Sequence, residues 1–261
     1  MRRVVRSFAF AALLLAGSAR GLSIQDEPRP EEVLVGGDAQ QRYFLHGPGP
    51  DAKAPSKGWR LLVVMPGGNG SADFAPFVGR IRENALGDDW LIAQIVAPRW
   101  DEEQVIVWPT KRSPTQGMEF TCEELFAAVV KDVGERRELD PRYLFTLTWS
   151  SSGMLAYTLA LDEDSGVTGS FIAMSVYKPD QLPSLKTAKG KPFYLLHSPE
   201  DQVCPLRMAE QARDELDEVG AQVEFVTYSG GHGWHGDVFG TLRTGLSWLE
   251  SKAEKAKLRK R

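Results

Sequence analysis

Three consecutive serines, Ser150 to Ser152, lie in the segment TLTWSSSGM, between an apolar run typical of a β-strand and a run with helical spacing. A serine at a sharp strand-to-helix turn can act as a nucleophile, because the turn exposes its hydroxyl above the sheet. The chemistry would be attack on a carbonyl carbon, with acyl transfer through the serine oxygen. The same segment also fits a polar turn whose serines cap the following helix.

The small residues around these serines favour Ser150 as the nucleophile. In the G-x-S-x-G elbow, glycines flank the serine because strand and helix pack closely there. Centred on Ser150, the pattern replaces the first glycine with Thr148 and the second with a serine. Centred on Ser151, it places Gly153 correctly but puts Trp149 where only a small side chain fits. We predict Ser150, with Thr148 as the residue that suits a structural turn better than an elbow.

A base that activates this serine must come from a histidine, and the chain has four. His232 and His235 both lie in YSGGHGWHGD, a glycine-rich loop between the last predicted strand and the last predicted helix. Glycines let the backbone turn so that the His232 imidazole points back over the sheet. We therefore predict His232 as the base and His235 as a polar loop residue. His46 lies in a Gly/Pro loop before the serine, and His197 ends a strand.

The acid of such a site belongs in the loop after the preceding strand. PFYLLHSPEDQVCP has Asp201 in that loop, with Glu200 beside it. Either carboxylate also fits an ordinary solvated loop. The order Ser150, Asp201, His232 is the order serine, acid, histidine, and it puts all three groups at the carboxyl ends of strands, where open α/β sheets build their sites.

A glycine-rich turn follows an early strand in LLVVMPGGNGSADF. Gly67, Gly68 and Gly70 expose backbone there, and a backbone N–H from such a turn can stabilise an oxyanion. Glycine-rich turns also bind phosphates, but the Lys-Ser/Thr pair of the phosphate-binding loop is absent.

The elements that must position these residues alternate along the chain. Near-continuous apolar runs of strand length indicate parallel strands buried on both faces: WRLLVVMP, WLIAQIVAP, YLFTLTW, GSFIAMS, PFYLLHS and VEFVTYS. Helical spacing occurs in TCEELFAAVVKDVGERREL, SSGMLAYTLAL, RMAEQARDELDEVG and GDVFGTLRTGLSWLESKAEK, the first with Thr121 and Glu124 as a capping box. EVLVGGDAQQRYFLHGP predicts an antiparallel hairpin at one edge. The pattern predicts an α/β fold with a mainly parallel sheet.

Composition and charge limit the classes of partner. The 261 residues carry a net charge of −4, which favours neither nucleic acid nor an anionic membrane surface. The two cysteines, Cys122 and Cys204, lack metal-site spacing, and we predict two free buried thiols rather than a pair.

The N-terminus has the pattern of a secretory signal peptide, with a basic MRRVVR, a short apolar run and the small residues of GSARG. We expect export to the periplasm or the extracellular space, and no stable membrane association after cleavage. An uncleaved anchor is the alternative. The predicted organisation is a signal peptide (1–21), a linker with the hairpin (22–58), a single core (59–252) and a charged tail (253–261).

Several of these motifs resemble those of a known group of proteins. DPRYLFTLTWSSSGM resembles DPxRVYVTGLSxGGM, with Asp140 and Met154 in register with Ser150. HSPEDQVCP resembles the acid loop HGxxDxxVP at Asp201, and GGHGW matches the base loop GGHxW at His232. Over about residues 59 to 250 the chain is therefore similar to the α/β-hydrolase superfamily, within it to the polyhydroxybutyrate depolymerase, feruloyl esterase and acetyl xylan esterase group.

The resemblance implies a three-layer α/β-hydrolase fold, with helices on both faces of the sheet, and hydrolysis of carboxylic esters. PGGNG stands where the group has HGxGG, so the implied oxyanion donors are the amides of Gly68 and Ser151. Trp108, Trp149 and Trp234 are the expected substrate-binding residues, the substrate is a small-molecule or polymeric ester, and no metal or organic cofactor is required.

Departures from the group leave two other functions open. Thr148 and Ser152 replace both elbow glycines, and Pro66 replaces the usual histidine. A catalytically inactive binding protein of the same fold, with loop tryptophans holding carbohydrate or polymer, is one alternative. A serine peptidase is the other, although the prolyl-oligopeptidase type usually carries an N-terminal propeller for which the chain has no room.

Overall fold

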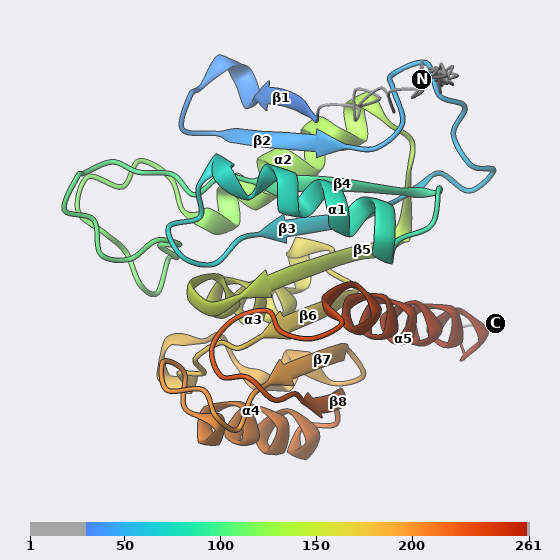
Figure 1. The fold of residues 1–261 in the computed structure, drawn as a ribbon. Coiled ribbons are helices and arrows are strands. Elements are labelled where there is room, and N and C mark those ends of the chain that lie inside the picture. Colours follow the sequence, from blue (N-terminus) through green and yellow to red (C-terminus); the bar gives the residue numbers. More distant parts are fainter. Residues whose placement is uncertain (1–29, 260–261) are drawn as a thin grey trace, which may run out of the picture.

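A computed structural model describes residues 30–259 of the chain, so the predicted signal peptide (1–21) and the start of the linker lie outside the described residues. These residues form an eight-stranded sheet in the order β1-β2-β4-β3-β5-β6-β7-β8 (Figure 1). The strands are β1 (Glu31–Leu34), β2 (Arg42–His46), β3 (Trp59–Met65), β4 (Trp90–Ile95), β5 (Leu139–Trp149), β6 (Gly169–Ala173), β7 (Pro192–His197) and β8 (Gln222–Thr227).

The sheet is parallel from β4 to β8 in this order, and its N-terminal edge is antiparallel. β1 pairs with β2 and β2 pairs with β4 in antiparallel register, whereas β3, β4, β5, β6, β7 and β8 pair in parallel. The predicted parallel sheet with an antiparallel N-terminal hairpin is therefore confirmed. All six apolar runs form strands because helices cover both faces of the sheet.

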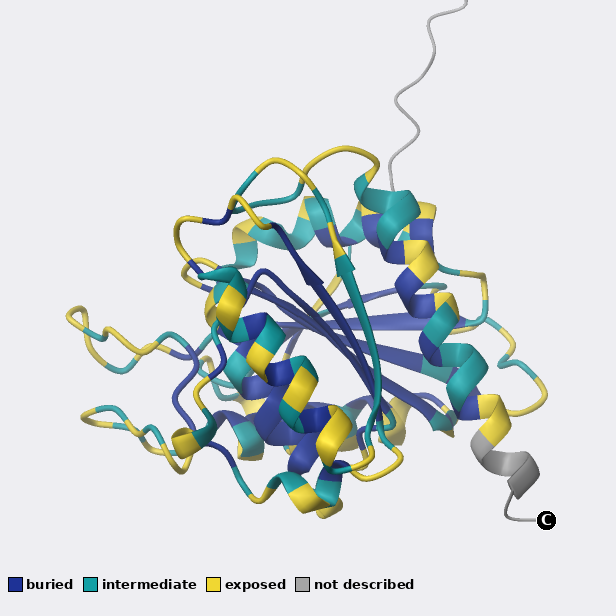
Figure 2. Cartoon of the chain, turned by 90° about the horizontal axis from the view of Figure 1, so that it is seen from below, coloured by how far each residue is buried: buried dark blue, intermediate teal, exposed yellow. Residues whose placement is uncertain are grey.

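The helices are α1 (Ala75–Ala85), α2 (Cys122–Arg136), α3 (Gly153–Leu161), α4 (Leu206–Glu218) and α5 (Val238–Arg259). α1 and α5 pack on one face of the sheet, against residues such as Leu62 and Val64. α2, α3 and α4 pack on the other face, against residues such as Leu61 and Val63. Figure 2 shows the buried strands between these two helical layers, which gives the predicted three-layer fold.

Two helices differ from the sequence expectation. α1 was not predicted, and it buries only Val78, Ile81 and Ala85 of its residues. α5 continues through Arg259, and Ala253 on it lies in the core. The predicted boundary between core and charged tail at residue 252 therefore falls inside a helix. Among residues 30–259, none of the helices combines the length and apolar composition that crossing a bilayer requires.

The connection from β4 to α2, residues 96–121, contains no helix or long strand, only an isolated bridge between Thr110 and Ser113. It is nevertheless packed, because the ring of Trp100 meets Phe120 edge-on at 5.1 Å and Trp108 is buried. Thr121 is the N-cap of α2 and forms the predicted capping box with Glu124.

Candidate active site

Ser150 follows β5 directly and has an unusual backbone. Its φ is +57°, and among the described residues only Met174 is another non-glycine with positive φ. This left-handed conformation costs energy for a residue with a Cβ, and such strain concentrates at functional sites. β5 lies in the middle of the sheet between β3 and β6. The turn therefore projects Ser150 from the centre of the carboxyl edge, as in a strand–nucleophile–helix elbow.

The neighbours of Ser150 explain how the elbow forms without its usual glycines. Thr148 is fully buried within β5, where it pairs with β3 and β6 and does not crowd the turn. Ser152 accepts a hydrogen bond from the Trp149 amide at 3.1 Å, and its hydroxyl lies 2.6 Å from the Met65 carbonyl oxygen. The position that requires a glycine is the one after Ser152, because a Cβ at Gly153 would lie 2.0 Å from the Ser175 Oγ.

The three residues predicted from different loops meet at this turn. His232 Nε2 lies 2.9 Å from Ser150 Oγ, and His232 Nδ1 lies 2.8 Å from Asp201 Oδ2. Because a carboxylate only accepts, Nδ1 carries the proton and Nε2 is free to accept from the serine hydroxyl. This arrangement can remove the hydroxyl proton as the oxygen attacks an electrophile. His235 is exposed and packs against Tyr228 instead.

Asp201 is held as a charged acceptor in a buried loop. Its Oδ1 accepts hydrogen bonds from the amides of Val203 and Cys204, both at 2.8 Å. Burial raises the pKa of this carboxyl, but the hydrogen bonds from His232 and from these two amides outweigh burial and hold the pKa below its ordinary value. Asp201 therefore remains an anion that fixes the tautomer of His232.

Three residues near Asp201, namely His197, Ser198 and Glu200, position the site, a role that was not predicted from the sequence. The Gly231 amide donates to Ser198 Oγ at 3.1 Å, and the Gly230 amide donates to the Glu200 carboxylate. These contacts tie the histidine loop to the acid loop. His197 Nε2 lies 2.7 Å from the carbonyl oxygen of Cys204. All three residues lie in the segment HSPED beside Asp201, but only the fold shows which way each side chain points.

The glycine turn, Gly67–Gly70, lies against the elbow. A Cβ at Gly67 would lie 2.5 Å from the Trp149 carbonyl oxygen, so only glycine fits. The Ser151 hydroxyl donates to the Gly68 carbonyl at 2.9 Å, which holds the turn beside the elbow. Within residues 30–259 the Gly68 amide donates to no acceptor. The Ser151 amide lies at the start of a short 3-10 helix (Ser150–Ser152), where N–H groups have no intrahelical partner. The predicted use of these amides as oxyanion donors stays a prediction.

The predicted substrate-binding tryptophans lie mostly in the interior. Trp108 is buried and its Nε1 donates to the Pro66 carbonyl oxygen at 3.1 Å, supporting the glycine turn. Trp149 is buried and meets the half-buried Trp234 edge-on at 5.7 Å. Trp149 and Trp234 thus pack the elbow against the histidine loop. Contact between the three tryptophans and a substrate stays a prediction.

One set of side chains has the composition of a metal site. Ligand atoms of Asp201, Cys204 and His232 lie within 4.8 Å of one another. The set fits a metal poorly, because Asp201 and His232 already bind each other through the atoms a metal would need. Burial, together with the charge of Asp201, also raises the pKa of the Cys204 thiol to about 11, so the sulfur stays protonated.

No protein-family model matches the chain, and no curated protein matches it. Solved structures do. A thermophilic esterase from the Planctomycetes species Thermogutta terrifontis, bound to propionate, is 14% identical, covers 88% of this chain and 96% of its own, and superimposes with a TM-score of 0.62. The same esterase phosphonylated by cyclosarin is 13% identical, with 88% and 96% covered and a TM-score of 0.60. The Bacillus cereus carboxylesterase is 14% identical, with 80% and 93% covered and a TM-score of 0.56. The chain thus has the α/β fold of these esterases, with Ser150, His232 and Asp201 joined by hydrogen bonds at its carboxyl edge.

Proposed function

We propose that this protein is a serine hydrolase of carboxylic esters. The observation that carries the proposal is the continuous hydrogen-bond chain from Ser150 through His232 to Asp201, built on a serine in a strained left-handed turn. A polar turn that merely caps a helix has no use for this strain or for a buried carboxylate behind a histidine. The esterases with the same fold support the choice of ester chemistry.

The geometry suggests how each residue acts. Ser150 Oγ attacks the ester carbonyl carbon while His232 Nε2 takes the hydroxyl proton. The amides of Gly68 and Ser151 bind the oxyanion that forms. His232 then returns the proton to the leaving alcohol, and an acyl group remains on Ser150. Water, deprotonated by His232, attacks this acyl group and releases the acid, while Asp201 stabilises the imidazolium in both halves.

The finer assignment rests on the sequence motifs. The resemblance to the polyhydroxybutyrate depolymerase, feruloyl esterase and acetyl xylan esterase group supports a small-molecule or polymeric ester as the substrate. The N-terminal pattern supports export to the periplasm or the extracellular space. Cell fractionation, followed by N-terminal sequencing of the mature protein, tests export. An unprocessed protein in the cytoplasm would reject it.

A fluorophosphonate probe and a short-chain nitrophenyl ester test the proposed chemistry. We expect wild type to be labelled and to turn over the ester, and Ser150→Ala to lose labelling and about four to six orders of magnitude in kcat. Ser56→Ala removes an exposed serine far along the chain and serves as the control. Loss of labelling in Ser151→Ala but not in Ser150→Ala would move the nucleophile by one residue. A wild type indistinguishable from Ser150→Ala in both assays would favour a non-catalytic binding protein.

The same assays separate the esterase from the peptidase. A nitroanilide of the same acyl group presents an amide in place of the ester. Both enzyme classes should cleave the activated ester faster, so hydrolysis of the anilide that is lost in Ser150→Ala would favour the peptidase, and no hydrolysis of the anilide would favour the esterase.

A further inference from the structure

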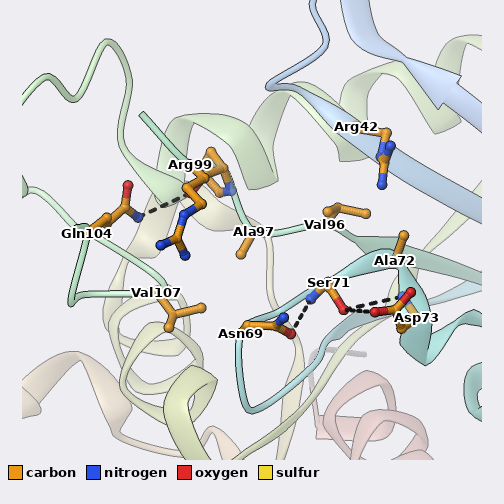
Figure 3. A pocket seen from close by; sticks show the side chains of 11 residues that line it. Arg42, Asn69, Ser71, Ala72, Asp73, Val96, Ala97, Arg99, Gln104 and Val107 are labelled. Carbon is orange, nitrogen blue, oxygen red and sulfur yellow. Dashed lines mark hydrogen bonds between the residues drawn. The ribbon is translucent and has the colours of Figure 1, made fainter. Parts of the chain in front are cut away.

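A cavity of about 300 Å³ opens beside the glycine turn, a volume at the lower end for small-molecule sites. We call it the arginine pocket. Its wall combines an apolar stretch after β4, which includes Val96 and Ala97, with polar side chains from β2, the glycine turn and the following loop. The polar residues are Arg42, Asn69, Ser71, Asp73, Arg99 and Gln104. Figure 3 shows Arg42 and Arg99 on opposite sides, with Asn69 and Ser71 between them.

The charges around the arginine pocket are predominantly positive. Arg99 forms no ion pair with a carboxylate of residues 30–259, and of its guanidinium only Nη2 is engaged, with the carbonyl oxygen of Glu102. Arg42 contacts Glu32 at 3.3 Å through Nη1, but its Nε is buried and has no hydrogen-bond partner among the described residues. Asp73 is the one carboxylate in the lining, and it already accepts a hydrogen bond from Ser71 Oγ at 3.1 Å. Two guanidinium groups thus retain donors for a further acceptor.

The glycine turn connects this pocket to Ser150. At one end, Gly67 packs on the carbonyl of Trp149, the residue before the serine. At the other end, the Gly70 carbonyl accepts a hydrogen bond from the Ala97 amide at 2.9 Å, and Ala97 lines the pocket. Gly68 and Asn69 between them are exposed. Since β4, β3 and β5 are neighbours in the sheet, the wall of the pocket that follows β4 lies two strand spacings, or about 10 Å, from the strand that ends at the serine, and Arg42 on β2 lies one spacing farther.

We propose that the arginine pocket is a subsite for a carboxylate at the far end of the substrate's acyl chain. The proposal rests on the ester hydrolysis proposed above and adds the class of substrate, an ester whose acyl chain ends in a carboxylate about 10 Å from the scissile carbonyl. The chain would lie over Gly68 and Asn69, and its carboxylate would accept hydrogen bonds from Arg42 and Arg99. Guanidinium groups match carboxylates in shape and charge, which favours this anion.

Matched pairs of esters test this subsite by hydrolysis. The acidic members are mononitrophenyl esters of dicarboxylic acids from pimelate to sebacate, and the neutral members carry a methyl ester on the far carboxylate. The readout is the ratio of kcat/KM between acidic and neutral members, which cancels any change in the fraction of active enzyme. We expect wild type to prefer the acidic member by about tenfold or more, the size of a charge-assisted hydrogen bond.

Variants assign that preference to the pocket. Arg42→Gln and Arg99→Gln should each lower the ratio several-fold, and the double variant should bring it close to one. Asp73→Asn removes the opposing charge and should raise the ratio. Arg213→Gln, which removes a cation on α4, is the matched control and should leave the ratio as in wild type. A wild-type ratio of one or less, or a preference that the double variant retains, overturns the proposal.

A binding measurement keeps the subsite separate from the chemistry. In Ser150→Ala, calorimetry with monoethyl suberate and with diethyl suberate measures affinity without hydrolysis. Tighter binding of the monoethyl ester that disappears with Arg42→Gln and Arg99→Gln supports the subsite even if no ester is turned over. Equal affinity for the two esters overturns the subsite, while turnover of neutral nitrophenyl esters would leave the proposed hydrolase intact.

Discussion

His197 Nε2 donates a hydrogen bond to the carbonyl oxygen of Cys204 at 2.7 Å, and the amide of Cys204 in turn donates to Asp201. One residue thus connects a fully buried histidine to the acid of the candidate triad. Because the acceptor is a carbonyl, His197 must carry its proton on Nε2. The same nitrogen lies 3.6 Å from Asp201 Oδ2, the oxygen that accepts from His232. His197 is therefore a positioning residue for the acid.

Replacing His197 tests this positioning. His197→Phe keeps a ring but loses the donor, so the acid loop shifts and kcat for an ester should fall about tenfold to a hundredfold with KM little changed. His197→Gln retains an N–H donor and should recover part of the loss. Steady-state kinetics on both variants check this, with thermal unfolding as the control for folding. Equal kcat in the two variants at similar stability would contradict the role.

Thr148 is a strand residue, and its replacement by glycine should not improve activity. It is fully buried and its Oγ1 lies 3.4 Å from the Phe171 carbonyl oxygen. Thr148→Gly loses packing and adds freedom to the unfolded chain, so the free energy of unfolding should fall by about 2 kcal/mol. Thr148→Val keeps the shape and should cost less. Urea unfolding and ester kinetics measure both effects, and a gain in kcat for Thr148→Gly would show that threonine obstructs the elbow.

His46 should make the fold sensitive to mild acid. Burial lowers the pKa of His46 to about 4, although its hydrogen bond with Gln94 partly opposes this. The unfolded chain binds the proton near its ordinary pKa of about 6.5. The stability from neutral His46 is therefore complete above about pH 6.5 and declines as the pH falls toward about 4, by up to about 3 kcal/mol.

Urea unfolding at about pH 7 and about pH 5 measures this decline in wild type and in His46→Gln. The variant cannot take up the proton, so its stability should change less between the two conditions. An equal change in the free energy of unfolding between the two pH values in both proteins would show that His46 takes up no proton on unfolding.

The two thiols should be inert in the folded protein. Cys122 and Cys204 are both free and buried, as predicted, and burial raises the pKa of each. Since only the thiolate reacts, a maleimide or a disulfide reagent at about pH 8 should label neither residue until the chain is denatured. Cys204→Ala should then halve the labelling of the denatured chain. Rapid labelling of the native protein that is lost in Cys204→Ala would indicate an opening of the acid loop.

The sequence predicted the sheet well because its signal is local. Strands buried on both faces need uninterrupted apolar residues, and each such run became a strand. α1 was missed for the opposite reason. Its segment APFVGRIRENA starts at an N-cap without a side-chain hydrogen bond and contains a glycine. Its three buried residues have a place in the core only because α5 packs beside α1, a contact that the segment itself does not indicate. The predicted boundary at residue 252 missed the core position of Ala253 and the hydrogen bond between Tyr143 and Glu254 for the same reason, because the charged composition around them does not reveal long-range contacts.

The sequence predicted the three main site residues and their order, but not the neighbouring residues that hold them in position. Ser150, Asp201 and His232 could be named because each follows a strand, and parallel strands end at the same edge. The roles of His197, Ser198 and Glu200 depend on rotamers and loop geometry, which no spacing encodes. The tryptophans illustrate the same limit. An indole in a glycine-rich or loop segment suits a binding surface or an interior equally, and packing placed Trp108 and Trp149 inside.

The positive φ of Ser150 opposes the thermal stability of the whole domain. A left-handed residue with a Cβ costs about 1 to 2 kcal/mol, and glycine adopts the same conformation freely. Ser150→Gly should therefore raise the melting temperature by a few degrees while removing the proposed nucleophile. The conformation that suits the proposed chemistry thus lowers stability, and selection for heat stability without an activity screen should favour the replacement of Ser150 by glycine.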